Sequence, residues 1–217
     1  MNEQFPNSEN KPERPSIKEG VDFVFEQHPE LSSIGTKEQY SNYLETIFPE
    51  SLLENIVYHG GEMKESPISE MSFFAESAET SKTFLKTMES AGTVEGYFLN
   101  MKNPKIYDSF WHYSGDEKNS FVGHENLLLN YFSQTHPETY SKIPEDQKTQ
   151  FIRNIHKNII EQHGYDSIIV EKDFWLEADE DGNGGSPEEK QYIVFEQGQF
   201  HQLGSELDMQ KFKEFVG

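Results

Sequence analysis

The feature that most constrains the fold is the segment Ile56-Val57-Tyr58-His59-Gly60-Gly61, an apolar run that ends in a histidine and two glycines. Its β-branched and aromatic residues are typical of a buried strand. Glycine adopts backbone angles closed to other residues and allows a ligand or another strand to approach the main chain. The segment therefore predicts a strand whose end is open to close approach, with the His59 side chain directed into that space.

Length and composition favour one compact domain. The chain has 217 residues, 34% of them apolar, and its 17 phenylalanines supply large rings for a core. Residues 1–16 contain Pro6, Pro12 and Pro15 among polar residues and cannot bury enough apolar surface to fold. We therefore expect a disordered tail or linker over 1–16 and a domain over 17–217.

The sequence contains no cysteine, which excludes disulfide frameworks, thiolate metal sites and cysteine nucleophiles. No segment has the roughly 18 consecutive apolar residues that a membrane span needs. The N-terminus lacks the basic and then apolar pattern of a signal peptide. We expect a soluble protein with no membrane partner.

The formal net charge is −21. Such a surface repels polyanions, and binding to phosphates needs clustered Lys and Arg, so a nucleic-acid target is disfavoured. A basic protein is the natural partner for this charge. The alternative is that the acidity only keeps the protein soluble.

Periodicity and turn residues predict several helices and strands. The clearest helix start is Thr36, which lies three residues before Gln39 as in a capping box. Expected helices span 36–48, 77–90, 124–134, 144–164 and a short 212–215. Expected strands span 73–75, 96–101, 105–107, 167–170 and, as the last, 192–195, which 199–203 follows. His156 and His163, on or beside the fourth helix, are interpreted as structural because no third ligand is in register.

Three separated segments share a known pattern. They are Tyr58-His59-Gly60, then Ser72-Phe73-Phe74-Ala75-Glu76 with Phe84 eleven residues after Phe73, and Lys190-Gln191-Tyr192-Ile193-Val194. Together they resemble the signature strands of the diphtheria-toxin and poly(ADP-ribose) polymerase branch of ADP-ribosyltransferases. The phrases Leu99-Asn100-Met101-Lys102-Asn103-Pro104 and Gly164-Tyr165-Asp166 extend the resemblance, which is closest to domains of phage and mobile-element polyvalent proteins.

The resemblance implies an α+β fold with a split, mostly antiparallel sheet. It also implies a mono-ADP-ribosyltransferase that moves ADP-ribose from NAD, its co-substrate, to a protein and releases nicotinamide. Such a toxin or effector would act in the cytoplasm of a bacterium or of an infected host cell. In transferases the loop before the third strand often meets the target, and here that loop is acidic, which again favours a basic protein.

The resemblance also assigns roles to residues. His59 would hydrogen-bond the adenosine ribose, and the Gly60 backbone would pair with the nicotinamide amide because a side chain there would block the ring. Phe73 and Phe84 would stack on either side of nicotinamide. Phe74, next to Phe73, is included among the residues expected to bind the cofactor.

The third segment departs from the family pattern, because Gln191 stands where the catalytic glutamate belongs. Glutamine can hydrogen-bond a ribose hydroxyl but brings no charge to the oxocarbenium-like transition state, and losing such a partner costs about 3 kcal/mol. Glu189 shares a strand face with Gln191, roughly 6.7 Å farther along, and Glu196 would face the opposite side. The alternatives are a weak or inactive module that binds NAD or ADP-ribose, and an acidic interaction or inhibitor protein on the same fold.

The acidic segment 177–189 imitates the start of a calcium loop through Asp179, Asp181, Asn183 and Gly184. The twelfth position, however, is Lys190, and no pair of helices brackets the segment. A solvated loop is the preferred interpretation, and no metal site is expected.

Overall fold

A computed structural model describes residues 17–61, 71–87, 92–110, 119–173 and 189–217. Its helices are α1 (Val21–Gln27), η1 (Pro29–Ser33), α2 (Lys37–Ile47), α3 (Ala78–Thr87), α4 (Phe121–Thr135), α5 (Pro137–Tyr140), η2 (Glu145–Gln147), α6 (Lys148–Gln162), η3 (Gln197–Gln199) and α7 (Glu206–Val216). Its strands are β1 (Val57–Gly60), β2 (Ser72–Ala75), β3 (Val94–Leu99), β4 (Pro104–Tyr107), β5 (Ser167–Asp173), β6 (Glu189–Val194) and β7 (Phe200–Gln202). The segment expected to be a tail, 1–16, and most of the acidic segment lie outside the described residues.

The described strands form one seven-stranded sheet in the order β4-β5-β6-β2-β1-β3-β7. Every neighbouring pair is antiparallel except β4 and β5, which run parallel. The α+β class and the mostly antiparallel sheet predicted from the sequence are therefore confirmed.

The pairing between β1 and β2, at the centre of the sheet, is the shortest among the described strands. β1 and β2 share a single register pair, Tyr58 with Ala75. By contrast, β1 has four register pairs with β3, and β2 has four with β6. The two halves of the sheet thus join through a short seam next to His59.

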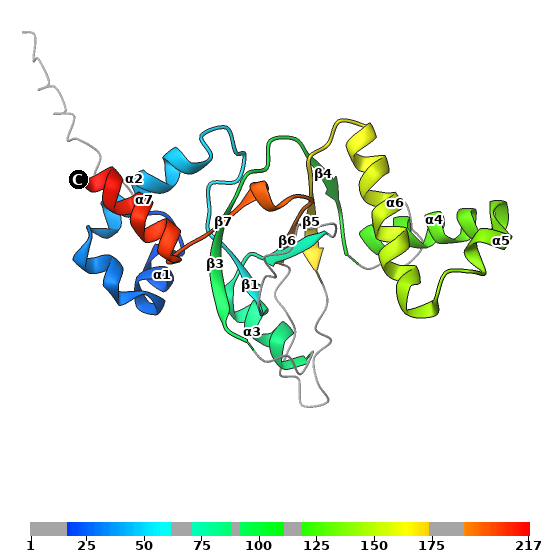
Figure 1. The fold of residues 1–217 in the computed structure, drawn as a ribbon, viewed down its shortest axis with the longest axis horizontal. Helices are drawn as coiled ribbons and strands as arrows, with labels where there is room; N and C mark the ends of the chain where they lie inside the picture. The colour runs from blue at the N-terminus through cyan, green and yellow to red at the C-terminus, as the bar shows by residue number, and fades with distance from the viewer. Residues whose placement is uncertain (1–16, 62–70, 88–91, 111–118, 174–188) are drawn as a thin grey trace, which may run out of the picture.

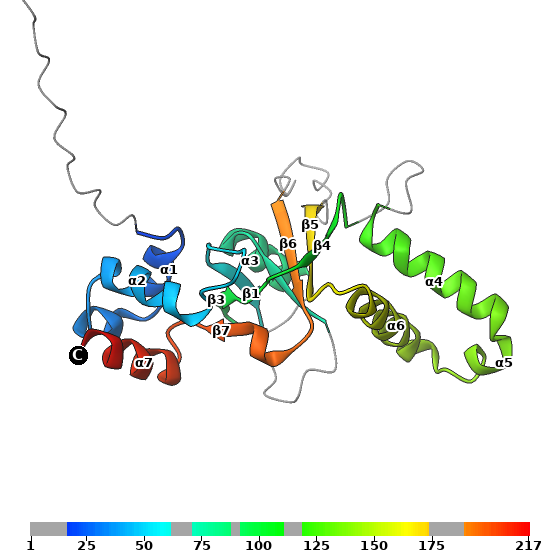
Figure 2. The ribbon, with the colours of Figure 1, turned by 90° about the horizontal axis from the view of Figure 1, so that it is seen from above.

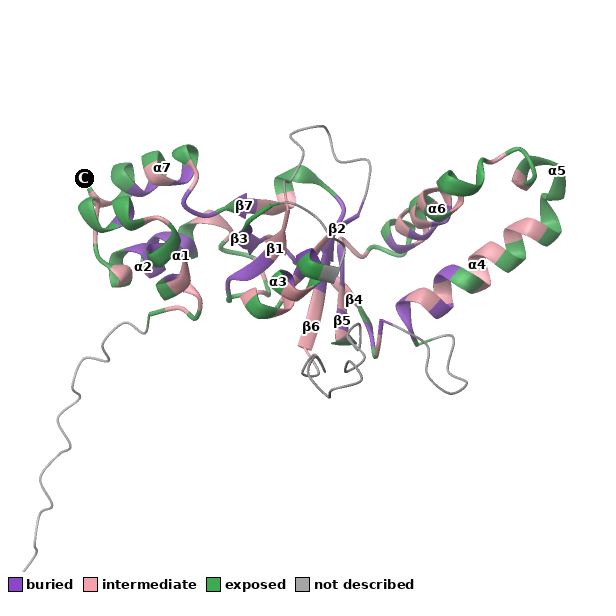
Figure 3. Ribbon diagram, turned by 90° about the horizontal axis from the view of Figure 1, so that it is seen from below, coloured by how far each residue is buried: buried purple, intermediate pink, exposed green. Residues whose placement is uncertain are grey.

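Helices cover the two ends of the sheet (Figures 1 and 2). α1, α2 and α7 gather beyond β3 and β7, whereas α4, α5 and α6 form an arm beyond β4 and β5, and α3 lies against β1. Buried residues concentrate in the sheet and on the inner sides of the helices, and the arm shows mostly intermediate and exposed positions (Figure 3). None of the helices in the described ranges is long and apolar enough to cross a membrane.

Local signals in the sequence explain several helix starts. Thr36 and Gln39 form the predicted capping box, in which the Thr36 side chain accepts a hydrogen bond from the Gln39 amide at 3.2 Å. The Ser77 hydroxyl accepts from the Thr80 amide at 3.1 Å and begins α3. Pro144 differs from the expectation: it precedes the 3₁₀ turn η2 and is not the first residue of the long helix.

Candidate functional site

The three segments that carry the resemblance are neighbours in the sheet. β6, β2 and β1 lie side by side at its centre. Tyr58 pairs with Ala75, and Ala75 pairs with Gln191, so one row of residues crosses all three strands. The fold therefore brings His59, Phe73 and Gln191 into one region, although about 130 residues separate the first segment from the last.

His59 is half-buried at the seam between β1 and β2. Its Nδ1 lies 2.8 Å from the main-chain carbonyl oxygen of Phe73. Burial lowers the pKa of His59, and the hydrogen bond to the carbonyl opposes that shift. Because a carbonyl only accepts, Nδ1 carries the hydrogen, and in the neutral ring Nε2 is left as an acceptor.

The predicted site residues divide between the two faces of the sheet. Residues opposite one another in an antiparallel pair share a face, and successive residues alternate. Phe73 and Gln191 therefore share one face, whereas His59 lies on the other beside Phe74 and Tyr97, with ring centroids 5.7 and 6.3 Å away. The imidazole reaches the first group through the Phe73 carbonyl, not through a ring contact.

Phe74 is only 1% exposed and packs against Tyr97 and Phe200, with ring centroids 5.2 and 5.8 Å away. This corrects its assignment as a residue that contacts the cofactor, because its ring belongs to the core of the sheet. Alternation explains the difference: Phe73 and Phe74 point to opposite faces, and only Phe73 faces the side of Gln191.

Phe73 is half-buried and already has aromatic neighbours. Its ring lies edge-on to Phe110 and Phe121, at centroid distances of 6.3 and 6.1 Å. The guanidinium carbon of Arg153, on α6, lies 5.1 Å from its centroid. The Arg153 guanidinium therefore already lies within interaction distance of the Phe73 ring, which the resemblance expects to stack on nicotinamide.

Helix α3 carries Phe84 and packs against Gly60 of β1 through other residues. Phe84 is 40% exposed on the helix. A Cβ at Gly60 would lie 2.7 Å from Leu85 Cγ and 2.8 Å from the Ser81 carbonyl oxygen. The packing of α3 against β1 therefore requires glycine at position 60, independently of any ligand.

Gln191 is half-buried on β6, where it pairs with Ala75 on one side and Val170 on the other. Glu189, two residues earlier, is held at the start of α3: its carboxylate accepts hydrogen bonds from Ser77 Oγ at 2.9 Å and Thr80 Oγ1 at 2.6 Å. The helix N-terminus favours a negative charge there. Glu189 thus has a structural role at the start of α3, whereas Gln191 contributes an uncharged amide.

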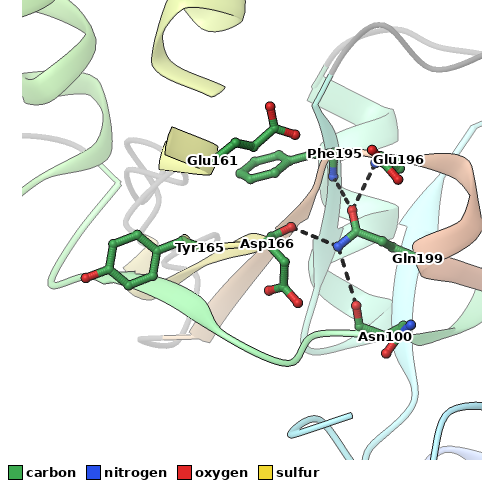
Figure 4. A pocket seen from close by; sticks show the side chains of 7 residues that line it. All are labelled: Asn100, Glu161, Tyr165, Asp166, Phe195, Glu196 and Gln199. Carbon is green, nitrogen blue, oxygen red and sulfur yellow. Dashed lines mark hydrogen bonds between the residues drawn. The ribbon is translucent and has the colours of Figure 1, made fainter. Parts of the chain in front are cut away.

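Two hollows in the described surface lie elsewhere. The first, about 340 Å³, is lined by Asn100, Glu161, Tyr165, Asp166, Phe195, Glu196 and Gln199 (Figure 4). The second, about 650 Å³, lies between α2, β7 and α7. Neither includes a residue predicted to bind NAD, although the first contains Glu196, which follows the end of β6.

The first hollow lies beside a set of hydrogen bonds between residues 99–104 and 164–166, the two segments that extend the resemblance. The Asp166 carboxylate accepts from the main-chain amides of Lys102 and Asn103, at 2.8 and 3.0 Å. The Gln199 side-chain amide donates to the Asp166 carbonyl at 2.8 Å (Figure 4). These residues tie the β3–β4 connection to the start of β5, which gives both phrases a structural role.

The sequence did not single out a polar cluster under the helical arm. The Tyr107 hydroxyl lies 2.6 Å from His124 Nδ1 and 2.7 Å from His156 Nε2. Glu125 Oε1 lies 3.5 Å from Arg153 Nε. The interpretation of His156 as structural agrees with its complete burial, and only the packing of α4 on α6 brings these residues together.

Within the described ranges no group of three or more His, Asp or Glu side chains is arranged to hold a metal ion. The calcium-like residues Asp179, Asp181, Asn183 and Gly184 lie outside those ranges.

Comparison of the chain with protein families, with curated proteins and with solved structures finds no match. Assignment of a function therefore rests on the residues and their geometry.

Proposed function

We propose that this chain is an NAD-dependent mono-ADP-ribosyltransferase that modifies a protein. The observation that supports the proposal is the adjacency of β1, β2 and β6, with Tyr58, Ala75 and Gln191 in one row. Three segments that are distant in sequence, with the residue types of an NAD-cleaving site, meet where the pairing between neighbouring strands is shortest. A sheet of the same composition could pair its strands in many other orders.

The reaction sets the chemical demands on these residues. The bond between nicotinamide and ribose breaks, nicotinamide leaves with the bonding electrons, and positive charge builds on the ribose before a side chain of the target protein attacks. The site must hold the dinucleotide rigidly and stabilise that charge. Neutral His59 offers Nε2 as an acceptor for a ribose hydroxyl, and Gln191 offers the oxygen of its amide.

A second candidate is a module that binds NAD or ADP-ribose and does not cleave it. Two observations favour it: Gln191 is uncharged, and the nearby carboxylate of Glu189 is held by the hydroxyls of Ser77 and Thr80. Without a carboxylate beside the ribose, the positive charge lacks its strongest electrostatic partner.

Calorimetry with NAD and measurement of nicotinamide release separate the candidates. Gln191→Glu is expected to raise nicotinamide release on the order of tenfold or more, because it adds a charge where the oxocarbenium forms. Gln202→Glu, at an exposed position of β7, is the matched control and should leave the rate unchanged.

His59→Ala is expected to weaken NAD binding in both candidates. Binding without nicotinamide release, in the wild type and in Gln191→Glu alike, would select the binding module. No binding of NAD by folded wild-type protein would reject both candidates.

A further inference from the structure

The larger hollow, about 650 Å³, lies between the end of α2, β7 and α7. Strand β7 is separated from β1 by β3, and α2 and α7 gather at that end of the sheet (Figure 1). The hollow is lined by Tyr43, Thr46, Ile47, Phe48, Gly198, Phe200, His201, Leu207, Lys211, Glu214 and Phe215. Its volume lies in the range of sites that hold small molecules. The proposed transferase activity makes no use of it.

A buried charge lies behind one wall of this hollow. Asp208 is completely buried, and its carboxylate accepts hydrogen bonds from the Tyr40 hydroxyl, the Tyr43 hydroxyl at 3.1 Å and the Gly204 amide at 2.8 Å. His201 Nε2 lies 2.7 Å from the same carboxylate. Burial of a carboxylate is costly unless donors of this kind surround it.

This carboxylate fixes the state of His201, which lines the hollow. Because Asp208 only accepts, Nε2 carries the hydrogen, and Nδ1 of the neutral ring is an acceptor. Nδ1 makes no hydrogen bond with another described residue. A carboxylate that orients one imidazole nitrogen and leaves the other unused is common at binding sites.

The lining of the hollow holds one ammonium, Lys211, and one carboxylate, Glu214. Lys211 makes no ion pair or ring contact within the described ranges, whereas Glu214 accepts a hydrogen bond from the side chain of Gln210 at 3.1 Å. The Lys211 ammonium is therefore available to a ligand in the hollow. Its natural complement is an anionic group.

The remaining wall is aromatic and aliphatic. Phe215 is 45% exposed and Leu207 is 56% exposed, both on the side of α7 that carries Lys211. Phe48, which follows α2, and Phe200 of β7 also line the hollow. Exposed rings of this kind favour a flat apolar ligand.

We propose that this hollow is a second binding site, for a small aromatic molecule that carries an anionic group. The ring would lie among Phe48, Phe200 and Phe215, the anion would pair with Lys211, and a hydroxyl or N–H of the ligand would donate to His201 Nδ1. The proposal goes beyond the transferase function and does not depend on it.

Titration of ¹⁵N-labelled full-length protein with phenyl phosphate, followed by NMR, tests the site. Saturable shifts are expected for amides of residues 46–48, 200–202 and 207–215, with a dissociation constant of about 1 to 10 mM for a ligand of this size. Inorganic phosphate, benzyl alcohol and benzylamine supply the anion alone, the ring alone and the opposite charge, and each should bind more weakly.

Lys211→Gln is expected to weaken phenyl phosphate binding at least about threefold. Lys213→Gln, an exposed change on the same helix outside the hollow, should have no effect, and His59→Ala should leave binding intact. Equal binding of benzylamine, an unchanged affinity in Lys211→Gln, or no saturable shift would overturn the proposal. Loss of binding in folded His59→Ala would also overturn it, because the two sites would then be one.

Discussion

The imidazole of His59 on β1 is joined to the main-chain carbonyl of Phe73 on β2 by a hydrogen bond of 2.8 Å. This bond lies beside the single register pair that connects the two halves of the sheet, Tyr58 with Ala75. The same residue therefore helps to close the seam between the strands and presents Nε2 to any ligand bound there.

Replacement of His59 by alanine is expected to lower the free energy of unfolding by about 1 to 2 kcal/mol, because the partly buried Phe73 carbonyl loses a donor and Phe74 loses a neighbour. Urea unfolding followed by circular dichroism measures the change. His163→Ala removes a similar hydrogen bond, from the imidazole to the Ile159 carbonyl at 2.8 Å, but at an exposed site. It should cost less than about 0.5 kcal/mol, and equal costs would contradict the role of His59 at the seam.

Replacement of Gly60 by alanine is expected to destabilise the protein by about 2 to 3 kcal/mol, because the new methyl group meets the Ser81 carbonyl and Leu85. Thermal unfolding reports the loss. Gly198→Ala is the control, since a Cβ at Gly198 meets nothing within 4 Å. If both variants unfold at the wild-type temperature, α3 does not need a glycine on β1.

Acid is expected to destabilise the attachment of the helical arm through His124. Burial, reinforced by nearby His156 and Lys105, lowers the pKa of His124 to about 4, against about 6.5 in an unfolded chain. Between these values the unfolded chain binds a proton that the folded protein does not, so stability falls as pH decreases. The contribution is complete above about pH 7 and lost near pH 4; partial exposure limits it to roughly 1 to 2 kcal/mol.

Urea unfolding at pH 7 and pH 5 measures this dependence. His124→Gln should reduce the difference in unfolding free energy between the two pH values, whereas His136→Gln, exposed on the same arm, should not. A residual difference is expected in His124→Gln because burial also lowers the pKa of His59. If the difference in unfolding free energy between pH 7 and pH 5 were as large in His124→Gln as in the wild type, the prediction would be contradicted.

Replacement of Asp208 by asparagine is expected to cost about 3 to 5 kcal/mol, because its donors lose the charge that they surround. Loss of this network should loosen α7 first, which hydrogen exchange detects as faster exchange of amides in 206–216. Glu206→Gln, exposed in the first turn of the same helix, is the matched control. Equal stability of the two variants would show that Asp208 does not anchor α7.

Much of the secondary structure could be predicted because its signals are local. The Thr36–Gln39 capping box, the strand that ends at His59 and the Gly164 that ends α6 each depend on a few adjacent residues. Helix α1 could not be predicted, since seven residues carry too little periodicity to distinguish a helix from a strand. Helix α7 is longer than the expected 212–215, because the polar residues of its exposed face obscure the apolar periodicity that would mark its start.

The candidate site was predicted less completely, because side-chain direction depends on register. Phe73 and Phe74 are adjacent and of the same residue type, so the sequence does not distinguish them. Only the pairing of β2 with β6 decides that Phe73 faces the side of Gln191 while Phe74 enters the core. Arg153 lies eighty residues from Phe73, and nothing local indicates that its guanidinium lies near that ring.

The sequence by itself determined most of the strands and helices and the residue types of the three segments that resemble an NAD-cleaving site, with a neutral residue in the third, because propensity and motif spacing are properties of short segments. Only the tertiary structure decided that β1, β2 and β6 are adjacent, that His59 and Phe73 occupy opposite faces, that Gly60 serves α3, and that Asp208 and His201 form the wall of a second hollow. These features depend on contacts between residues far apart in the chain, where register and helix packing select one arrangement among many.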